Sequence, residues 1–175
     1  MCQLKNYSAA IEVFTEGKEF VYDNKPFLAQ FYANIGDAQN QLKNHAASDS
    51  AYDMALEIDP NNVYVLNNYA YYLSLRNINL DKAEKMSKKS NELEPNNNSY
   101  QDTYGWILFK QNKTNEAIKV LESAYRAQPT ESVIAEHLGD AYWRVGRTLE
   151  ARFQCDTVHR WILVWRVCDN IQPDQ

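Results

Sequence analysis

The side chains best suited to catalysis or metal binding are few in this chain and widely spaced. The 175 residues include three histidines and three cysteines, which are His45, His137, His159, Cys2, Cys155 and Cys168. No serine or cysteine accompanies a histidine in the local context of a nucleophilic triad. Cys155 and His159 are four residues apart, but two ligands do not make a metal site. We therefore expect no enzymatic activity, no metal site and no cofactor.

Charge and glycine usage exclude two further classes of ligand. The formal net charge is −5, and the densest basic run, from Lys82 to Lys89, is interrupted by Glu84. A nucleic-acid partner normally requires a concentrated basic face, so none is expected. Gly105 and Gly139 stand alone, which argues against a phosphate-binding loop. No stretch reaches the roughly 18 apolar residues of a membrane span, and no signal peptide opens the chain.

The elements that would position any binding residues are repeated along the chain. The stretch Asn98–Pro129 has counterparts on both sides, and small residues recur in it at intervals of 34 or 35. In a first predicted helix the small residues are Gly36, Ala70, Gly105 and Gly139. In a second they are Ser48, Ala83, Ala117 and Ala151, and prolines follow at 60, 95 and 129. Small residues at mid-helix predict close approach of a neighbouring helix, since glycine costs a free helix about 1 kcal/mol relative to alanine.

This pattern resembles the tetratricopeptide repeat, in its 34-residue period, its small residues and its terminal prolines. The resemblance implies an all-α fold, a right-handed α-solenoid of antiparallel helix pairs. The phrases NNYAYYL and YQDTYGWILFKQ further resemble bacterial tetratricopeptide proteins of the cell envelope. That likeness implies a periplasmic or outer-membrane-associated location for the full-length parent, with the cytoplasm as the alternative.

We predict one continuous solenoid domain. Residues 1–25 are interpreted as the second helix of a truncated repeat plus a connector, because no first helix precedes them. The alternatives are a chain that begins as a fragment and a helix that serves as an N-terminal cap; the fragment is favoured, because a cap normally carries a polar outer face. The predicted repeats and tail then follow as residues 26–62, 63–97, 98–131, the degenerate 132–165, and 166–175. One extra residue in the turn 77–80 accounts for the longer second repeat.

The end of the fourth repeat departs from the family pattern. Residues 161–165 form an apolar run, WILVW, that one helical stripe cannot bury. Three interpretations stay open: contact with another chain, an unusual cap on the solenoid, or an altered reading of the coding sequence. In the first, the self-association residues are Trp161, Ile162, Val164 and Trp165.

The resemblance implies that the first helices line a concave groove. The groove residues that we predict are Tyr64, Asn67, Asn68, Tyr71, Asp102, Trp106, Phe109, Glu136, Asp140 and Trp143. Rigid rings among them could anchor a ligand or merely fill the interior of the superhelix, whereas the polar members could hold a ligand backbone. A clamp for a C-terminal carboxylate is not expected. Such a clamp needs basic or amide side chains at set groove positions, and those positions hold Ala33, Asp37, Ser99 and Thr103.

The leading hypothesis is a non-catalytic protein–protein interaction scaffold that binds a peptide or helix in a concave aromatic groove. The alternatives are a structural self-association element, forming a homodimer through the apolar C-terminal helix, and a regulatory fragment of a larger protein. The hypotheses differ in which rings matter, those of the groove or those of the tail.

Overall fold

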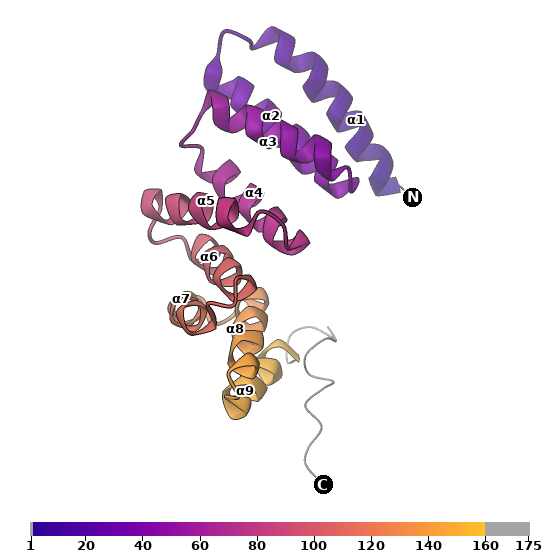
Figure 1. Cartoon of the computed structure of the whole chain (residues 1–175). Helices are drawn as coiled ribbons and strands as arrows, with labels where there is room; N and C mark the ends of the chain where they lie inside the picture. Colours follow the sequence, from indigo (N-terminus) through magenta and orange to yellow (C-terminus); the bar gives the residue numbers. More distant parts are fainter. Residues whose placement is uncertain (1, 160–175) are drawn as a thin grey trace. The chain divides into compact units, whose positions relative to one another are not determined.

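The computed structural model describes the backbone of residues 2–159 and the side chains of residues 6–154. This part of the chain is all helical, as predicted from the sequence (Figure 1). The helices are α1 (Cys2–Gly17), a 3-10 turn η1 (Lys18–Phe20), α2 (Lys25–Gln41), α3 (His45–Ile58), α4 (Val63–Arg76), α5 (Leu80–Leu93), α6 (Asn98–Lys110), α7 (Thr114–Ala127), α8 (Ser132–Arg144) and α9 (Thr148–His159).

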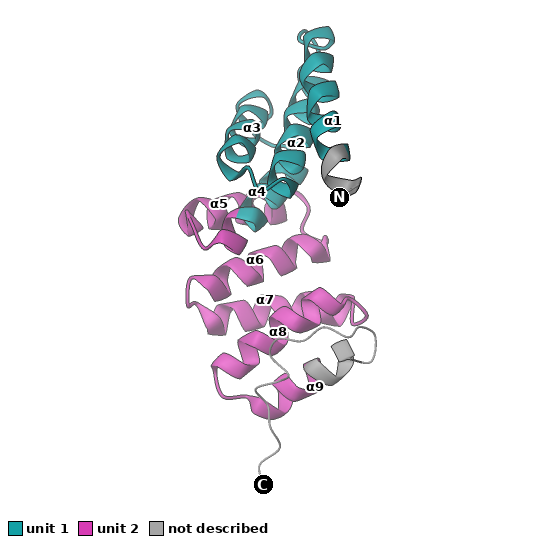
Figure 2. Ribbon diagram, turned by 90° about the vertical axis from the view of Figure 1, so that its right-hand side faces the viewer, with its two compact units in different colours: residues 1–72 teal, residues 73–175 magenta. Residues whose placement is uncertain are grey.

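The chain divides into two compact units, which Figure 2 shows in different colours. Unit 1 covers residues 1–72 and contains α1, α2, α3 and the first part of α4. Unit 2 covers residues 73–175 and contains the rest of α4 and helices α5 to α9. Within the units, helices adjacent in the chain pack in pairs, most extensively α2 with α3, α6 with α7 and α8 with α9. In the described part of the chain, no helix combines the length and apolar character that crossing a membrane requires.

Asparagine side chains begin several of the helices. The Asn24 side chain accepts a hydrogen bond from the Phe27 N–H. In the same way, Asn62 accepts from the Val65 N–H and Asn97 accepts from the Tyr100 N–H. Each bond satisfies one of the N–H groups that a helix start leaves without an intrahelical partner. Pro26 occupies the first turn of α2, as predicted, where its missing N–H costs nothing.

The turn between the two helices of each pair repeats the same backbone motif. A residue with positive φ follows the end of each first helix by one or two positions, at Lys43, Asn77, Asn112 and Gly146, which are 34, 35 and 34 residues apart. At each of them two N–H groups bond back to carbonyls three and five residues earlier, the Schellman arrangement. Asn79, with φ 48°, is an additional left-handed residue in the turn where the sequence predicts one extra residue.

The glycines at mid-helix lie where a neighbouring helix approaches closely. A Cβ on Gly105 would lie 2.6 Å from Cγ of Leu121, and one on Gly36 would lie 2.9 Å from the Tyr52 ring. Ser48, a buried small residue of α3, donates its hydroxyl proton to the Gly36 carbonyl at 2.8 Å. Close helix packing thus explains the small residues of the repeat, as predicted from their spacing.

Candidate functional site

A buried Asp–His pair joins the two first helices of unit 2. Nδ1 of His137 on α8 lies 2.9 Å and 3.0 Å from the two carboxyl oxygens of Asp102 on α6. Both side chains are buried. Because Nδ1 faces this carboxyl, the pair sets the orientation of the imidazole ring and holds α8 against α6.

Three rings stack beside this pair. The imidazole of His137 lies parallel to the indole of Trp106, with centroids 4.1 Å apart, and the indole stacks on Phe109 at 5.1 Å. Only 8% of Trp106 and 5% of Phe109 remain exposed. The sequence predicts both rings at groove positions, either as anchors for a ligand or as filling of the superhelix interior. In the structure, most of their surface contacts other side chains of the protein.

Two cationic side chains lie over the stack. Lys110 Nζ is 4.5 Å from the centroid of the Trp106 ring, and the Arg144 guanidinium is 3.5 Å from that of Phe109. Arg144 also donates to the Phe109 carbonyl at 2.8 Å. Cations attract the negative faces of aromatic rings, so these contacts stabilise the stack.

The accessible part of this surface is formed by α8. Glu136, Asp140 and Trp143 follow one another at helical spacing, and Trp143 is 39% exposed. Burial first, and then the Glu136 charge, raise the pKa of the Asp140 carboxyl to about 6, although His137, Lys110 and Arg144 oppose the shift. Together with the side chains described above, these residues form a surface that we call the α6–α8 face. It consists of Asp102, Trp106, Phe109, Lys110, Glu136, His137, Asp140, Trp143 and Arg144.

Replacing Asp140 by asparagine should stabilise the chain above neutral pH. The folded state holds the Asp140 proton more tightly than the unfolded chain, so the contribution of this group to stability is complete at low pH. It is lost as pH rises through about 6. After discounting the shift for solvent screening, we expect Asp140→Asn to raise the free energy of unfolding by about 1 kcal/mol at about pH 7.5.

Urea unfolding at a series of pH values measures this effect. The difference between Asp140→Asn and the original chain should disappear below about pH 4, where Asp140 is protonated in both states. A difference that persists unchanged at low pH would mean that the Asp140 charge is not its cause.

Two predicted groove residues of this face carry buried polar atoms without a hydrogen-bond partner among the described side chains. These atoms are Nε1 of Trp106, a donor, and Oδ1 of Asp140, an acceptor. The acceptor Oδ1 of Asn67, in unit 1, is a third. Buried polar groups are normally paired, so such atoms are candidates for contact with an added group.

In unit 1 one of the predicted groove residues, Tyr64, contacts a carboxyl group. Tyr64, 41% exposed, donates its hydroxyl proton to Oδ2 of Asp37, and Asn67 donates to Asn68 at 3.2 Å. Tyr71 is half-buried and lies next to the Tyr72 ring. Burial and the neighbouring Asp37 raise the pKa of Tyr64, which keeps its hydroxyl protonated as a donor.

Sequence reasoning missed Tyr52 and Tyr72, which also donate to Asp37. The contact of Tyr72 could have been predicted from its separation from Asp37 along the sequence. Asp37 and Tyr72, Asp102 and His137, and Phe109 and Arg144 are each 35 residues apart. The equivalent small residues of these repeats lie 34 residues apart. Two side chains separated by 35 residues, one more than this period, therefore contact each other across successive first helices. Tyr52 comes from a second helix and follows no such rule.

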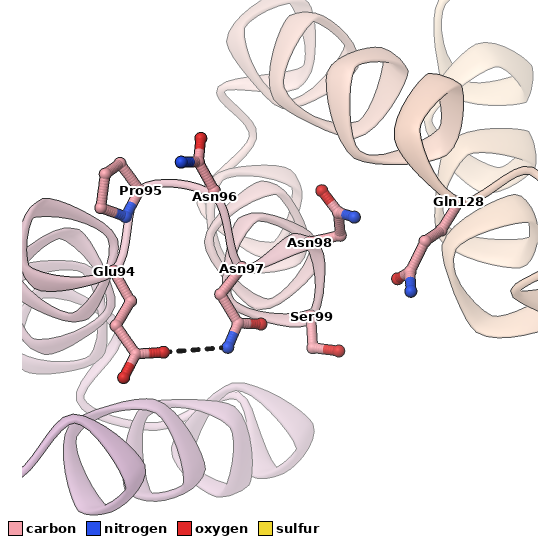
Figure 3. A pocket seen from close by; sticks show the side chains of 7 residues that line it. All are labelled: Glu94, Pro95, Asn96, Asn97, Asn98, Ser99 and Gln128. Carbon is pink, nitrogen blue, oxygen red and sulfur yellow. Dashed lines mark hydrogen bonds between the residues drawn. The ribbon is translucent and has the colours of Figure 1, made fainter.

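A polar cavity of about 480 Å³ lies at the turn between α5 and α6, and Figure 3 shows its lining. Asn97 donates from its amide to Glu94 at 3.1 Å and accepts from the Tyr100 N–H at 3.4 Å. Both polar atoms of this amide are therefore used to form the turn and the helix start. The cavity reflects local turn structure. Of its lining residues, Ser99 alone stands at a groove position considered in the sequence.

The predicted self-association residues, Trp161, Ile162, Val164 and Trp165, lie outside the described residues. The described part of α9 nevertheless exposes two large apolar side chains, with Leu149 80% and Phe153 64% accessible. In this described part of the chain, no group of three or more His, Cys, Asp or Glu side chains is placed to hold a metal ion.

Comparison with known proteins identifies the repeat. Two family models of the tetratricopeptide repeat match this chain. One matches residues 51–85, and the other matches residues 29–62 and 100–131. Together they cover just over half of the chain. The chain belongs to the tetratricopeptide repeat family. Repeats of this family act as non-catalytic protein-interaction scaffolds, so family membership assigns this general role to the chain.

Among curated proteins, the chain is similar to the TPR repeat-containing protein PA4667 of Pseudomonas aeruginosa, with 32% identity over 82 residues. The alignment covers 47% of this chain, which spans only 14% of that relative's length.

Solved tetratricopeptide structures share the fold at low sequence identity. MamA of Desulfovibrio magneticus RS-1 has a TM-score of 0.68 at 12% identity, over 86% of this chain and 94% of that chain. The structure titled as a functional characterisation of pilF from Pseudomonas aeruginosa has a TM-score of 0.66 at 17% identity, over 89% and 78%. At these identities the likeness shows the fold alone.

Proposed function

We propose that the chain is a protein-interaction scaffold that holds a segment of a partner protein on the α6–α8 face. One observation carries the proposal. Trp143, a large ring, is 39% exposed on this face, one helical turn from a half-buried carboxyl whose Oδ1 has no hydrogen-bond partner among the described residues. Exposed aromatic rings beside desolvated polar groups are typical of binding hot spots.

The chemistry of the face indicates what the partner segment offers. An apolar side chain would pack on the Trp143 ring. Backbone N–H groups or a basic side chain would meet Glu136 and Asp140, whose carboxyls lie close enough for the Glu136 charge to raise the pKa of Asp140. Carbonyl groups would meet Lys110, which covers Trp106 through a cation–π contact that a ligand can replace. An extended peptide presents all three kinds of group together.

The test is a selection of random short peptides against the immobilised chain, followed by affinity measurements on the enriched sequences. Trp143→Ala should weaken their binding by at least about 30-fold, equivalent to about 2 kcal/mol for a hot-spot ring. Glu136→Gln should weaken it less, because Glu136 is exposed and screened by solvent. The binding should also weaken below about pH 6, as Asp140 becomes protonated.

Phe153→Ala provides the matched control, because Phe153 is also an exposed ring of unit 2 but belongs to α9. It should leave peptide affinity unchanged. Peptides that bind equally to the original chain and to Trp143→Ala, with both chains folded, would overturn the proposal for this face.

Self-association is the competing proposal, and the exposed Leu149 and Phe153 of α9 are the observation that favours it. Light scattering on the original chain and on Phe153→Ala reports it directly. A dimer that becomes monomeric in the variant, without enrichment of any peptide, would favour association through α9 over the α6–α8 face. A location in the bacterial cell envelope stays a prediction from sequence resemblance.

A further inference from the structure

Unit 1 contains an open cavity of about 440 Å³ between α1, α2 and the part of α4 that belongs to this unit. Its volume lies within the range of small-ligand sites. Four aromatic rings contribute to its lining: Tyr7 and Phe14 from α1, and Tyr64 and Tyr72 from α4. The Asp37 carboxyl of α2 lies among them, and the remaining lining side chains are small or carry neutral amides.

Tyrosine hydroxyl groups hold Asp37 in place. Tyr52 and Tyr72 donate to Oδ1, at 2.5 Å and 3.4 Å, and Tyr64 donates to Oδ2 at 2.5 Å. These donors are neutral. They orient the carboxyl and satisfy part of its hydrogen-bonding capacity without cancelling its charge, since an ionised carboxyl accepts about four hydrogen bonds.

The composition of the lining selects a cation. Asp37 is the one ionisable carboxyl among the lining residues, and no lysine or arginine belongs to that described set. Aromatic rings attract cations through their negative faces, and this attraction strengthens when water is partly excluded. A fixed negative charge surrounded by rings is therefore complementary to a long basic side chain, whose apolar stem also packs on aromatic carbon.

We propose that this cavity binds a basic side chain, arginine or lysine, from a partner protein. The carboxyl of Asp37 would accept from the cationic group, and the rings of Tyr64, Tyr72 and Phe14 would pack against its stem. This site lies wholly in unit 1 and is separate from the α6–α8 face of unit 2. It therefore goes beyond the function proposed above, and either proposal can fail while the other holds.

The test uses two capped tripeptides, acetyl-Gly-Arg-Gly-amide and its neutral analogue with citrulline in place of arginine. Each is titrated into the isotopically labelled chain, and backbone amide shifts are followed by nuclear magnetic resonance. The arginine peptide should shift amides around Asn34, Asp37 and Tyr64 in a saturable way. The citrulline peptide, of nearly the same shape but uncharged, should bind at least about tenfold more weakly, because the charge-assisted bond is lost.

Matched variants assign the effect to the cavity. Asp37→Asn should remove the preference for arginine, whereas Glu57→Gln, an equal charge change at an exposed position of α3, should leave it unchanged. Trp143→Ala should also retain it, which separates this site from the α6–α8 face.

Equal shifts with both peptides, shifts confined to other residues, or no shifts would each overturn the proposal. If Asp37→Asn unfolds the chain, the comparison of the two peptides on the original chain still decides the matter. A lysine peptide in place of the arginine peptide then shows whether the site distinguishes the planar guanidinium from the ammonium group.

Discussion

Replacing His137 by phenylalanine is expected to lower the free energy of unfolding by about 3 kcal/mol. The phenyl ring can keep the stacking on Trp106, which lies 4.1 Å from the imidazole centroid. It cannot replace Nδ1, which lies 2.9 Å from the Asp102 carboxyl. The variant therefore leaves a buried carboxyl without the partner that the pair provides, and such a group is costly to bury.

Urea unfolding followed by circular dichroism measures this change, and a second variant identifies its cause. In Asp102→Leu/His137→Phe both polar partners become apolar, so most of the lost stability should return. If the double variant is no more stable than His137→Phe, the loss comes from packing, and the Asp–His pair is not what holds α6 and α8 together.

Substitutions at the contact between Gly105 and Leu121 are expected to cause the second large loss in the free energy of unfolding. Leu121 is fully buried, and Leu121→Ala should cost about 3 kcal/mol through lost burial and a residual cavity. Gly105→Ala should also destabilise, by about 1 to 2 kcal/mol. Its new Cβ would lie 2.6 Å and 2.8 Å from the branched end of the leucine. This direction is opposite to the stabilisation of about 1 kcal/mol that alanine brings to a free helix.

Combining the two changes tests the geometry. In Gly105→Ala/Leu121→Ala the added methyl group meets no leucine branch, so the double variant should be more stable than the sum of the single effects predicts. Ser99→Ala, an exposed change in the same helix, should alter the free energy of unfolding by less than about 0.5 kcal/mol. Additive effects of Gly105→Ala and Leu121→Ala would show that the two sites are not in contact.

The helical architecture could be read from local sequence. The spacing of Gly36, Gly105 and Gly139 predicts close helix contacts, and added Cβ atoms at these three positions meet a neighbouring helix within 3.4 Å. Pro26 predicts a helix start that the structure contains. These features are predictable because each depends on interactions within one helix or between helices adjacent in the chain.

The state of the candidate site was decided by contacts between repeats. The sequence placed Trp106 and Phe109 on the first helix of their repeat, but their burial depends on His137 and Arg144 of the next repeat, 31 and 35 residues later. Likewise Asp37 was visible as a polar first-helix residue, whereas its donors Tyr64 and Tyr72 come from α4 of the next repeat.

The physical reason for this division lies in the range of the interactions. Helix periodicity, capping and turn chemistry act over a few residues, so the sequence by itself determined the family, the helix pairs and the positions of candidate side chains. Whether a ring is exposed or a carboxyl is paired depends on side chains about 35 residues away, whose rotamers and packing follow no local pattern. Only the tertiary structure decided that Trp106 is covered, that Trp143 is accessible, and that Asp37 lies in a cavity lined by rings.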